Sequence, residues 1–251
     1  VGCRIDSMFL KEEEGFVPNM GEFCRRIESG AYDLVFFCNP NNPTSTATAP
    51  SEMRKILSRC RELGIFVMID ETYAEFAPDP SDITAIPLAS RYDNFMVIRG
   101  VSKFFASPGL RFGYGITGSK ELLSALLLHQ NPWSLNSIGA YAGELMLKDS
   151  VYIQATWNLI DSERTRVCQE LTTIDGLKIY KPYANFVLIR ILKDGLTSFD
   201  LFEAAIHENL MIRDCSSFET LEGEYIRFCF LMPQENDRLL DCLKRALKAR
   251  Q

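Results

Sequence analysis

Short runs of wholly apolar residues, each ending in polar residues, alternate with amphipathic stretches through the first part of this chain. Leu34–Cys38 ends in an Asn/Pro turn, and Ile65–Ile69 ends at an aspartate. Such runs are typical of strands buried on both faces of a parallel sheet. Residues 51–62 between them carry apolar side chains at helical spacing, with Ser51 as the expected N-cap and Gly64 just past the end. This order predicts βαβ units and an α/β fold with a mostly parallel sheet flanked by helices.

The pattern changes in the last third of the chain. Apolar positions at helical spacing over 153–171 predict a long helix that leads from one domain to another. The segments after it mix strands and helices without βαβ order, which indicates a smaller α+β domain. We therefore expect a large domain over 1–155 and a small C-terminal domain over 156–251. The other expected strands are Phe95–Ile98, Phe112–Ile116, Leu177–Tyr180, Phe186–Ile191 and Tyr225–Phe230, and the other expected helices are 120–129, 136–148, 199–208 and 235–247.

Charge and cysteine usage narrow the class of protein. The 251 residues carry a net charge of −6, which argues against nucleic-acid binding, and no apolar run is long enough for a membrane span. Eight cysteines and two histidines show no spacing typical of a zinc site or a disulfide framework. Several cysteines, including Cys38 and Cys229, lie in apolar runs where a reduced thiol packs as a small hydrophobe. We expect a cytoplasmic protein with no metal.

Polar side chains gather where three successive expected strands end. Asn42, Asp70 and Lys103 each follow one of these strands. In open α/β sheets, ligands bind at the carboxyl ends of the strands, so these groups mark a candidate site. Taken singly, each has a simpler explanation: Asp70 as a helix N-cap or one half of a salt bridge, and Lys103 as a surface lysine whose stem covers apolar atoms.

Together these groups meet the needs of pyridoxal 5′-phosphate. Its aldehyde needs a lysine amine, offered by Lys103, to form a Schiff base. Its pyridine nitrogen needs a carboxylate, offered by Asp70, to stay protonated. Donors for its phenolic oxygen, and a cation with a short donor for its phosphate, are offered by Asn42, Tyr73, Arg111 and Ser102.

Three segments carry a family resemblance that extends over essentially the whole chain. Residues 39–44 (NPNNPT), 70–73 (DETY) and 102–111 (SKFFASPGLR) resemble, in order and separation, the motifs of fold-type I pyridoxal-phosphate enzymes. They are most similar to the branch that holds histidinol-phosphate aminotransferase and threonine-phosphate decarboxylase. The resemblance implies an aminotransferase-type large domain, a small domain, and a homodimer with active sites at the subunit interface.

The resemblance also implies a role for individual residues. Lys103 matches the Schiff-base lysine and Asp70 the partner of the ring nitrogen. Two arginines of the small domain match substrate ligands: Arg227 for the α-carboxylate, and Arg213 for a phosphate at the other end of the substrate. The remaining matches are Tyr73 and Asn42 at the phenolic oxygen and Ser102 and Arg111 at the cofactor phosphate.

Two positions and one region depart from the family pattern. Gly100 stands where the family usually has Ser or Thr against the phosphate, and Ser45 stands where a glycine is usual. The chain starts at Val1, inside an apparent strand, and lacks the N-terminal portion that carries a phosphate-binding helix and the aromatic residue stacked on the ring. We expect a piece of a longer protein that retains the cofactor weakly or not at all by itself.

The resemblance leaves the reaction open between three readings. Four features look more like threonine-phosphate decarboxylase, which favours decarboxylation of L-threonine O-3-phosphate for the cobalamin side chain: residues 130–136, 147–151 with 155–157, 212–218 and 106–109. Tyr73 favours the alternative, a histidinol-phosphate-type aminotransferase that passes an amino group to 2-oxoglutarate. In either case the substrate is a small phosphorylated amino acid or amino alcohol. The third alternative is an inactive truncated fragment.

Overall fold

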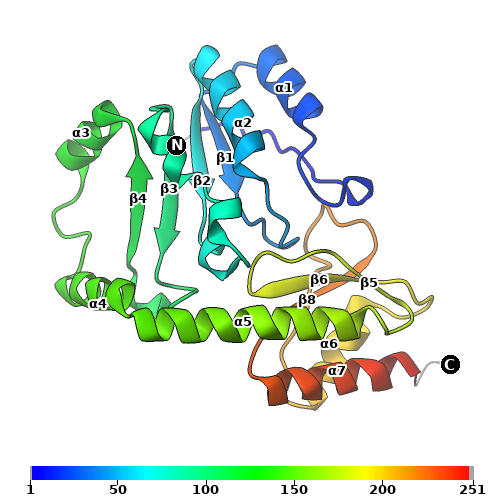
Figure 1. Ribbon diagram of the computed structural model, residues 1–251. Coiled ribbons are helices and arrows are strands. Elements are labelled where there is room, and N and C mark those ends of the chain that lie inside the picture. The colour runs from blue at the N-terminus through cyan, green and yellow to red at the C-terminus, as the bar shows by residue number, and fades with distance from the viewer. Residues whose placement is uncertain (1, 249–251) are drawn as a thin grey trace.

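The computed structural model describes residues 2–248 and contains two sheets joined by one long helix (Figure 1). The first sheet has the strand order β1-β2-β3-β4. Its first three strands are parallel and the last is antiparallel, which confirms the expected α/β fold with a mostly parallel sheet. The strands are β1 (Leu34–Cys38), β2 (Phe66–Asp70), β3 (Phe95–Gly100) and β4 (Gly113–Thr117). The expectation that the chain opens within a strand is wrong for residues 2–11, which form no helix or strand.

Two helices, α1 (Met20–Ser29) and α2 (Pro50–Glu62), pack against the same side of this sheet through one apolar cluster. The helical spacing read from the sequence brings the apolar side chains of α2 to that side. Ser51 is not the N-cap, because Pro50 already occupies the first turn and Ala49 precedes it without a side-chain bond. The side chains of α2 buried in this cluster are Met53, Ile56, Leu57 and Cys60.

Strand β1 is buried on one side only, so the prediction of burial on both faces is wrong. Val35 and Phe37 pack against the cluster beneath α1 and α2. Leu34 and Phe36 point the other way and are 51% and 59% exposed. The reason is that the described residues place no helix over the second face of β1, where these two side chains lie.

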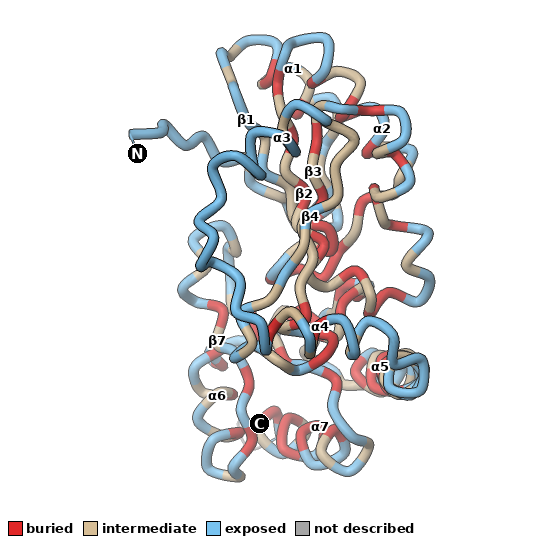
Figure 2. The backbone as a smooth tube through the Cα atoms, turned by 90° about the vertical axis from the view of Figure 1, so that its left-hand side faces the viewer, coloured by how far each residue is buried: buried red, intermediate tan, exposed pale blue. Residues whose placement is uncertain are grey.

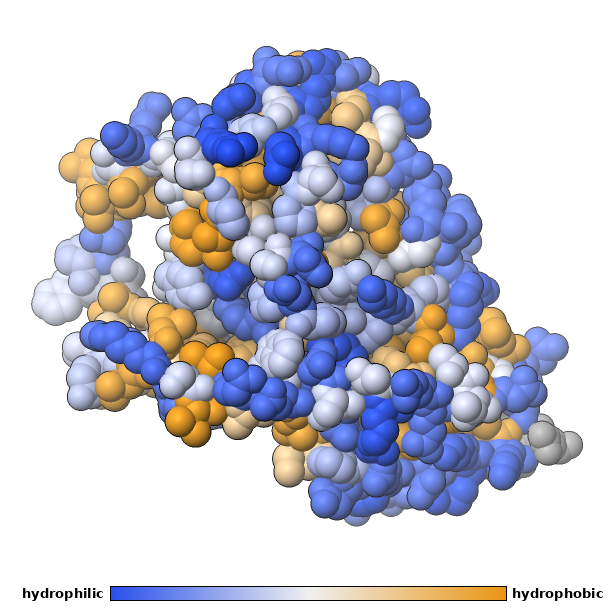
Figure 3. All heavy atoms as spheres, viewed as in Figure 1, coloured by the Kyte–Doolittle hydropathy of each residue, from blue (hydrophilic) through white to orange (hydrophobic). Residues whose placement is uncertain are grey.

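The helices α3 (Lys120–His129) and α4 (Ser137–Lys148) also expose apolar side chains to solvent. No residue of α3 is buried, and Trp133, between the two helices, is 90% exposed. Figure 2 shows this stretch as a nearly continuous exposed segment, and Figure 3 shows hydrophobic side chains gathered over both helices. The largest exposed apolar side chains here are Leu127, Leu128, Ile138, Tyr141 and Leu145.

Helix α5 (Ser150–Leu171) runs alongside both sheets and leads to the second one (Figure 1). The second sheet has the order β5-β6-β8-β7 and is wholly antiparallel, as expected for an α+β small domain. The elements are β5 (Leu177–Ile179), β6 (Phe186–Ile191), β7 (Arg213–Asp214), β8 (Glu224–Cys229), α6 (Ser198–His207) and α7 (Pro233–Lys248). The short 3-10 helices of the chain are Glu12–Glu14, Ala74–Phe76, Pro80–Asp82, Ile86–Ser90 and Pro108–Leu110.

One apolar core passes from the first region into the second. Phe76, Val101 and Phe104 belong to the same buried cluster as Val167 of α5 and Phe228 of β8. Residues 155 and 156 both lie within the continuous helix α5, so no break in the chain marks the expected boundary between the two domains. That boundary remains a prediction.

Two side chains of α5, the half-buried Trp157 and the buried Arg164, reinforce this junction. Trp157 donates to the carbonyl oxygen of Ala77 at 3.0 Å. The guanidinium of Arg164 donates to the carbonyl oxygens of Phe76 at 2.5 Å and Ala184 at 3.4 Å. The segment that follows β2 and the start of the small domain are therefore held by one helix.

All eight cysteines are free thiols. Cys60 is buried, and burial raises the pKa of its thiol to about 12. Cys38 is half-buried and Cys229 is exposed, so Cys229 does not pack as the expected small hydrophobe. Among the described residues, no helix is long and apolar enough to cross a membrane, and no group of three or more potential metal ligands is found.

Candidate functional site

The sheet register places the ends of β1, β2 and β3 side by side. Cys38 is paired with Asp70, and Asp70 with Ile98. Asn42 follows β1, Asp70 ends β2 and Lys103 follows β3. The three residues therefore lie at the carboxyl edge of the sheet, as the sequence pattern predicts.

The carboxylate of Asp70 has only a local partner. Its Oδ1 accepts hydrogen bonds from the backbone N–H of Thr72, at 2.9 Å, and from the Thr72 hydroxyl. Asp70 neither caps a helix nor takes part in an ion pair within residues 2–248, so both simpler explanations fail. The Asp70 carboxylate is half-buried and has no protein cation beside it among the described residues, so it is available to a cationic ligand.

Lys103 is exposed and reaches toward Tyr73. Its Nζ lies 5.9 Å from the centroid of the Tyr73 ring, and the described structure gives it no hydrogen bond or ion pair. The Tyr73 ring in turn packs edge-on against Phe186 of β6, with centroids 5.0 Å apart. The amine thus stands free beside a wall made by both regions of the molecule.

Arg227 of β8 brings the small domain to this edge. Its Nη1 donates to the side-chain oxygen of Asn42, and its guanidinium lies 4.8 Å from the centroid of the Phe186 ring. Its Nε is buried and has no hydrogen-bond partner. A buried N–H group without a partner is costly, and an anion bound there would satisfy it.

Arg213 lies directly opposite Arg227 on the neighbouring antiparallel strand β7. Residues directly opposite each other in such a pair project from the same face, so two guanidinium groups share one face. Arg213 Nη2 donates to the hydroxyl of Ser217 at 2.8 Å, and its guanidinium lies 5.6 Å from the Phe218 ring centroid. Like charges placed opposite each other are destabilising unless negative charge comes between or beside them.

The two expected phosphate ligands, Ser102 and Arg111, lie just beyond the paired ends of β3 and β4, without a hydrogen bond between their side chains among the described residues. Ser102 is half-buried in the turn after β3. Arg111 is exposed, adopts a left-handed backbone conformation with φ of 51°, and donates to the carbonyl oxygen of Pro108 at 3.1 Å. In the described part of the chain, no hydrogen bond or ion pair joins the Arg111 side chain to the other predicted site residues.

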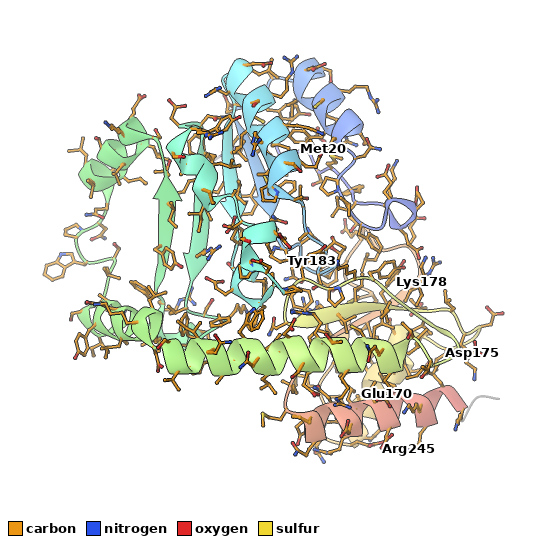
Figure 4. All side chains as sticks on the ribbon, in the orientation of Figure 1. Met20, Glu170, Asp175, Lys178, Tyr183 and Arg245 are labelled. Carbon is orange, nitrogen blue, oxygen red and sulfur yellow. The ribbon has the colours of Figure 1, made fainter. Side chains whose placement is uncertain are left out.

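Both departures from the family pattern have a local physical reason. A Cβ atom on Gly100 would lie 3.2 Å from the carbonyl oxygen of Phe112, because β4 passes very close. Ser45 adopts φ of 61°, where glycine is favoured. Its hydroxyl accepts from the N–H of Ala184 at 3.0 Å, and its carbonyl from the N–H of Tyr183 at 2.8 Å. These bonds hold the loop after β1 against the small domain, where Figure 4 labels Tyr183.

A buried ion cluster beside the site was missed by sequence reasoning. Glu71, directly after Asp70, pairs with Arg99 of β3, and Glu75 contacts the same guanidinium. The signal was present in the sequence, because a charged residue next to an apolar run needs a partner of opposite charge. No pattern indicated that this partner would come from the next strand.

The chain is similar to known proteins over nearly its whole length. Residues 1–243 match the model of the family described as aminotransferase class I and II. It is 31% identical over 246 residues to threonine-phosphate decarboxylase of Salmonella typhimurium, covering 98% of this chain and 66% of that protein. It is also 31% identical to histidinol-phosphate aminotransferase of Ruminiclostridium cellulolyticum, covering 96% of this chain and 64% of that one.

Solved structures agree with this. The histidinol-phosphate aminotransferase of Clostridium acetobutylicum superposes with a TM-score of 0.87 at 32% identity, covering 94% of this chain and 70% of that one. A decarboxylase from Sulfurospirillum multivorans gives a TM-score of 0.89 at 25% identity, covering 98% and 64%. The chain thus spans about two thirds of the length of these relatives. By fold, motif order and sequence similarity, it belongs to the aminotransferase class I and II family.

Proposed function

We propose that this chain forms part of a pyridoxal 5′-phosphate-dependent enzyme that acts on a small phosphorylated amino acid. The observation that carries the proposal is the pair of arginines, Arg213 and Arg227, on one face of the second sheet. The pair fits a substrate with two anionic groups, and the buried, unpartnered Nε of Arg227 is a donor that such a substrate would satisfy.

The residues at the strand ends fit the cofactor. Lys103 supplies a free amine, and Asp70 a carboxylate without a cation, while Asn42 and Tyr73 supply donors for the phenolic oxygen. Ser102 and Arg111 remain proposals for its phosphate. When bound, the cofactor supplies an electron sink for a bond broken at the substrate Cα.

The protein side chains would then divide the work. Arg227, held by Asn42 and stacked on Phe186, would bind the α-carboxylate and fix its direction. Arg213, with Ser217 beside it, would bind the phosphate. Lys103 Nζ would carry the proton to or from Cα, because no described ion pair holds it.

Decarboxylation of L-threonine O-3-phosphate is the reaction we favour. Support comes from the relatives named threonine-phosphate decarboxylase and from residues 130–136, 147–151 with 155–157, 212–218 and 106–109. The product, an aminopropanol phosphate, would serve the cobalamin side chain. Amino-group transfer to 2-oxoglutarate is the second candidate, favoured by Tyr73 and by the relatives named histidinol-phosphate aminotransferase. We further propose a cytoplasmic homodimer.

One incubation separates these reactions. The full-length protein is loaded with cofactor and given either L-threonine O-3-phosphate or histidinol phosphate, each with 2-oxoglutarate, and carbon dioxide release is measured beside glutamate formation. Carbon dioxide without glutamate supports the decarboxylase, and glutamate from histidinol phosphate supports the aminotransferase. Lys103→Ala should abolish either activity. Turnover by this variant would contradict the role of Lys103, and no turnover by the wild type with either substrate would contradict both candidate reactions.

A second variant tests the phosphate site. Arg213→Met should raise KM for the phosphorylated substrate about 10- to 100-fold, the loss expected for a charge-assisted hydrogen bond. Unphosphorylated threonine, which offers Arg213 no phosphate, is the matched control substrate. An equal loss with both substrates would show that Arg213 does not read the phosphate.

A further inference from the structure

Glu71, Arg99 and Glu75 form an ion cluster next to the proposed site, and Thr84 is hydrogen-bonded to it. Glu71 follows Asp70 in the chain, and Arg99 precedes Lys103 by four residues. The Glu71 side chain is 0% exposed and that of Arg99 12%. The acid and the amine of the proposed site are therefore each attached, within a few residues, to one half of a buried ion pair.

The hydrogen bonds of the pair join the ends of β2 and β3. Arg99 donates to Glu71 Oε2 from Nη2 at 2.6 Å and from Nε at 3.1 Å. Glu71 Oε1 accepts from the N–H of Ala85 at 2.6 Å, and Thr84 donates to Oε2 at 2.7 Å. The N–H of Glu71 donates to the carbonyl oxygen of Ile98 at 2.9 Å. Glu71 is thus fixed to β3 through both its backbone and its side chain.

This anchorage constrains Asp70 as well. Successive side chains along an extended strand project to opposite sides, so a fixed Glu71 sets the direction in which Asp70 projects. The side chain of Asp70 has only Thr72 as a partner, which leaves its outward reach to be set by its neighbour. On the other side of the pair, Arg99 holds the strand that leads into the turn of Lys103.

Stability alone is a poor reason for such a pair. Replacing a buried ion pair by apolar residues is often neutral or stabilising, because desolvation offsets the attraction. Here the cost is increased by a second carboxylate: Glu75 Oε1 lies 3.4 Å from Arg99 Nη1, and Glu75 Oε2 is buried without a partner. A costly cluster placed between the two reactive residues is better explained by the geometry it enforces.

We propose that the Arg99–Glu71 ion pair is the positioning element that fixes the separation and direction of Asp70 and Lys103 across the β2–β3 boundary. Neither residue contacts the bound molecules in this account, so both are positioning residues. This inference rests on the proposed function, because it assigns a task to residues that serve the same cofactor.

The expected signature is spectroscopic. A protonated ring nitrogen, maintained by Asp70, lowers the pKa of the nitrogen that links the cofactor to Lys103, because like charges disfavour each other. If Arg99→Met loosens the contact between the Asp70 carboxylate and the ring nitrogen, this pKa should rise. The visible absorbance of the lysine-bound cofactor changes with pH, and the midpoint of that change should rise by about one pH unit. Arg99→Lys, which keeps the charge but not the fork, should give a smaller rise.

Two further variants separate positioning from stability. Glu71→Gln breaks the ion pair while keeping the side-chain shape, and should raise the midpoint even if Arg99→Met fails to fold. Arg166→Met is the matched control, because Arg166 pairs with the buried Glu163 in the small domain, away from the strand ends. It should lower the unfolding temperature and leave the midpoint unchanged.

The outcomes are distinct from those of the proposed function. Wild-type absorbance that disappears in Lys103→Ala establishes the cofactor site itself. Given that signal, a midpoint unchanged in both Arg99→Met and Glu71→Gln would overturn the positioning role, whatever the unfolding temperatures. If wild-type protein gives no lysine-dependent absorbance, the proposed function fails and the positioning role fails with it.

Discussion

The two sheets of this molecule differ in how completely they are covered. The second sheet packs α6 and α7 against a core in which β6 is almost wholly buried. The first sheet is covered by α1 and α2 on one side, while Leu34 and Phe36 of β1 stay exposed on the other. The less completely covered sheet nevertheless carries the lysine and the aspartate of the proposed site.

The region around the second sheet therefore contributes most of the apolar burial, whereas the first sheet carries the lysine and the aspartate of the proposed site. Apolar burial near the small domain extends through α5 to Phe76, Val101 and Phe104, directly beside the strand ends. The proposed site is therefore supported from the small-domain side, and Arg227 and Ser45 connect the two regions at that point. We expect substitutions in the core around the second sheet to lower the free energy of unfolding most strongly.

The largest contrast is expected between two apolar truncations. Leu243→Ala removes a wholly buried side chain and should cost about 3 kcal/mol of unfolding free energy, through lost transfer energy and a residual cavity. Phe36→Ala, on the open face of β1, should change it by about 0.5 kcal/mol or less. Urea unfolding measures both values. Equal losses would mean that the face of β1 is covered in solution.

Removing the arginine that joins the two regions should have the next largest effect. Arg164→Met leaves the carbonyl oxygens of Phe76 and Ala184 without a buried donor, and should cost about 2 kcal/mol. Arg238→Met is the control, because its ion pair with Glu235 is exposed and should contribute about 0.5 kcal/mol or less. Thermal unfolding at fixed pH tests the pair, and a neutral Arg164 variant would refute the proposed tie between the regions.

Helix caps offer a smaller test of the same contrast. Thr197 and Asp200 form a capping box at the start of α6, so Thr197→Ala should lose about 1 kcal/mol. Ser51→Ala should lose almost nothing, because Ser51 lies inside α2 and makes no cap bond. If Ser51→Ala costs as much as Thr197→Ala, Ser51 is the N-cap of α2 after all, as the sequence predicts.

The smallest effect concerns pH and Glu75. Burial raises the pKa of Glu75 above its ordinary value of 4.5, although Arg99 partly opposes this. The folded form then binds the proton more tightly than the unfolded form, so this group costs stability as pH rises through the folded pKa. Glu75→Gln cannot ionise, and its stability relative to wild type should increase as the pH rises above 4.5. A difference that stays constant with pH would contradict the raised pKa.

Sequence patterns predicted individual elements better than their surroundings. Phe186–Ile191 and Lys120–His129 have the bounds expected from periodicity, because local side-chain spacing decides them. The open face of β1 was not predicted, since an apolar run does not reveal which neighbours a strand has. The antiparallel direction of β4 was likewise hidden, because periodicity carries no information on strand direction.

The candidate site divides in the same way. Motif order located Asn42, Asp70 and Lys103 at the correct strand ends, and Tyr73 and Arg227 within reach of them. The contact of Arg227 with Asn42, the opposition of Arg213 and Arg227, and the ion pair of Glu71 with Arg99 depend on tertiary packing. No local pattern contains those distances.

The most direct test of the account is to find which lysine the cofactor attaches to. The full-length protein is mixed with stoichiometric pyridoxal 5′-phosphate, reduced with borohydride to make the link permanent, digested, and mapped by mass spectrometry. We expect one pyridoxyl group, on the peptide that contains Lys103, and its loss in Lys103→Ala. Attachment to a different lysine, or label spread evenly over surface lysines, would contradict it.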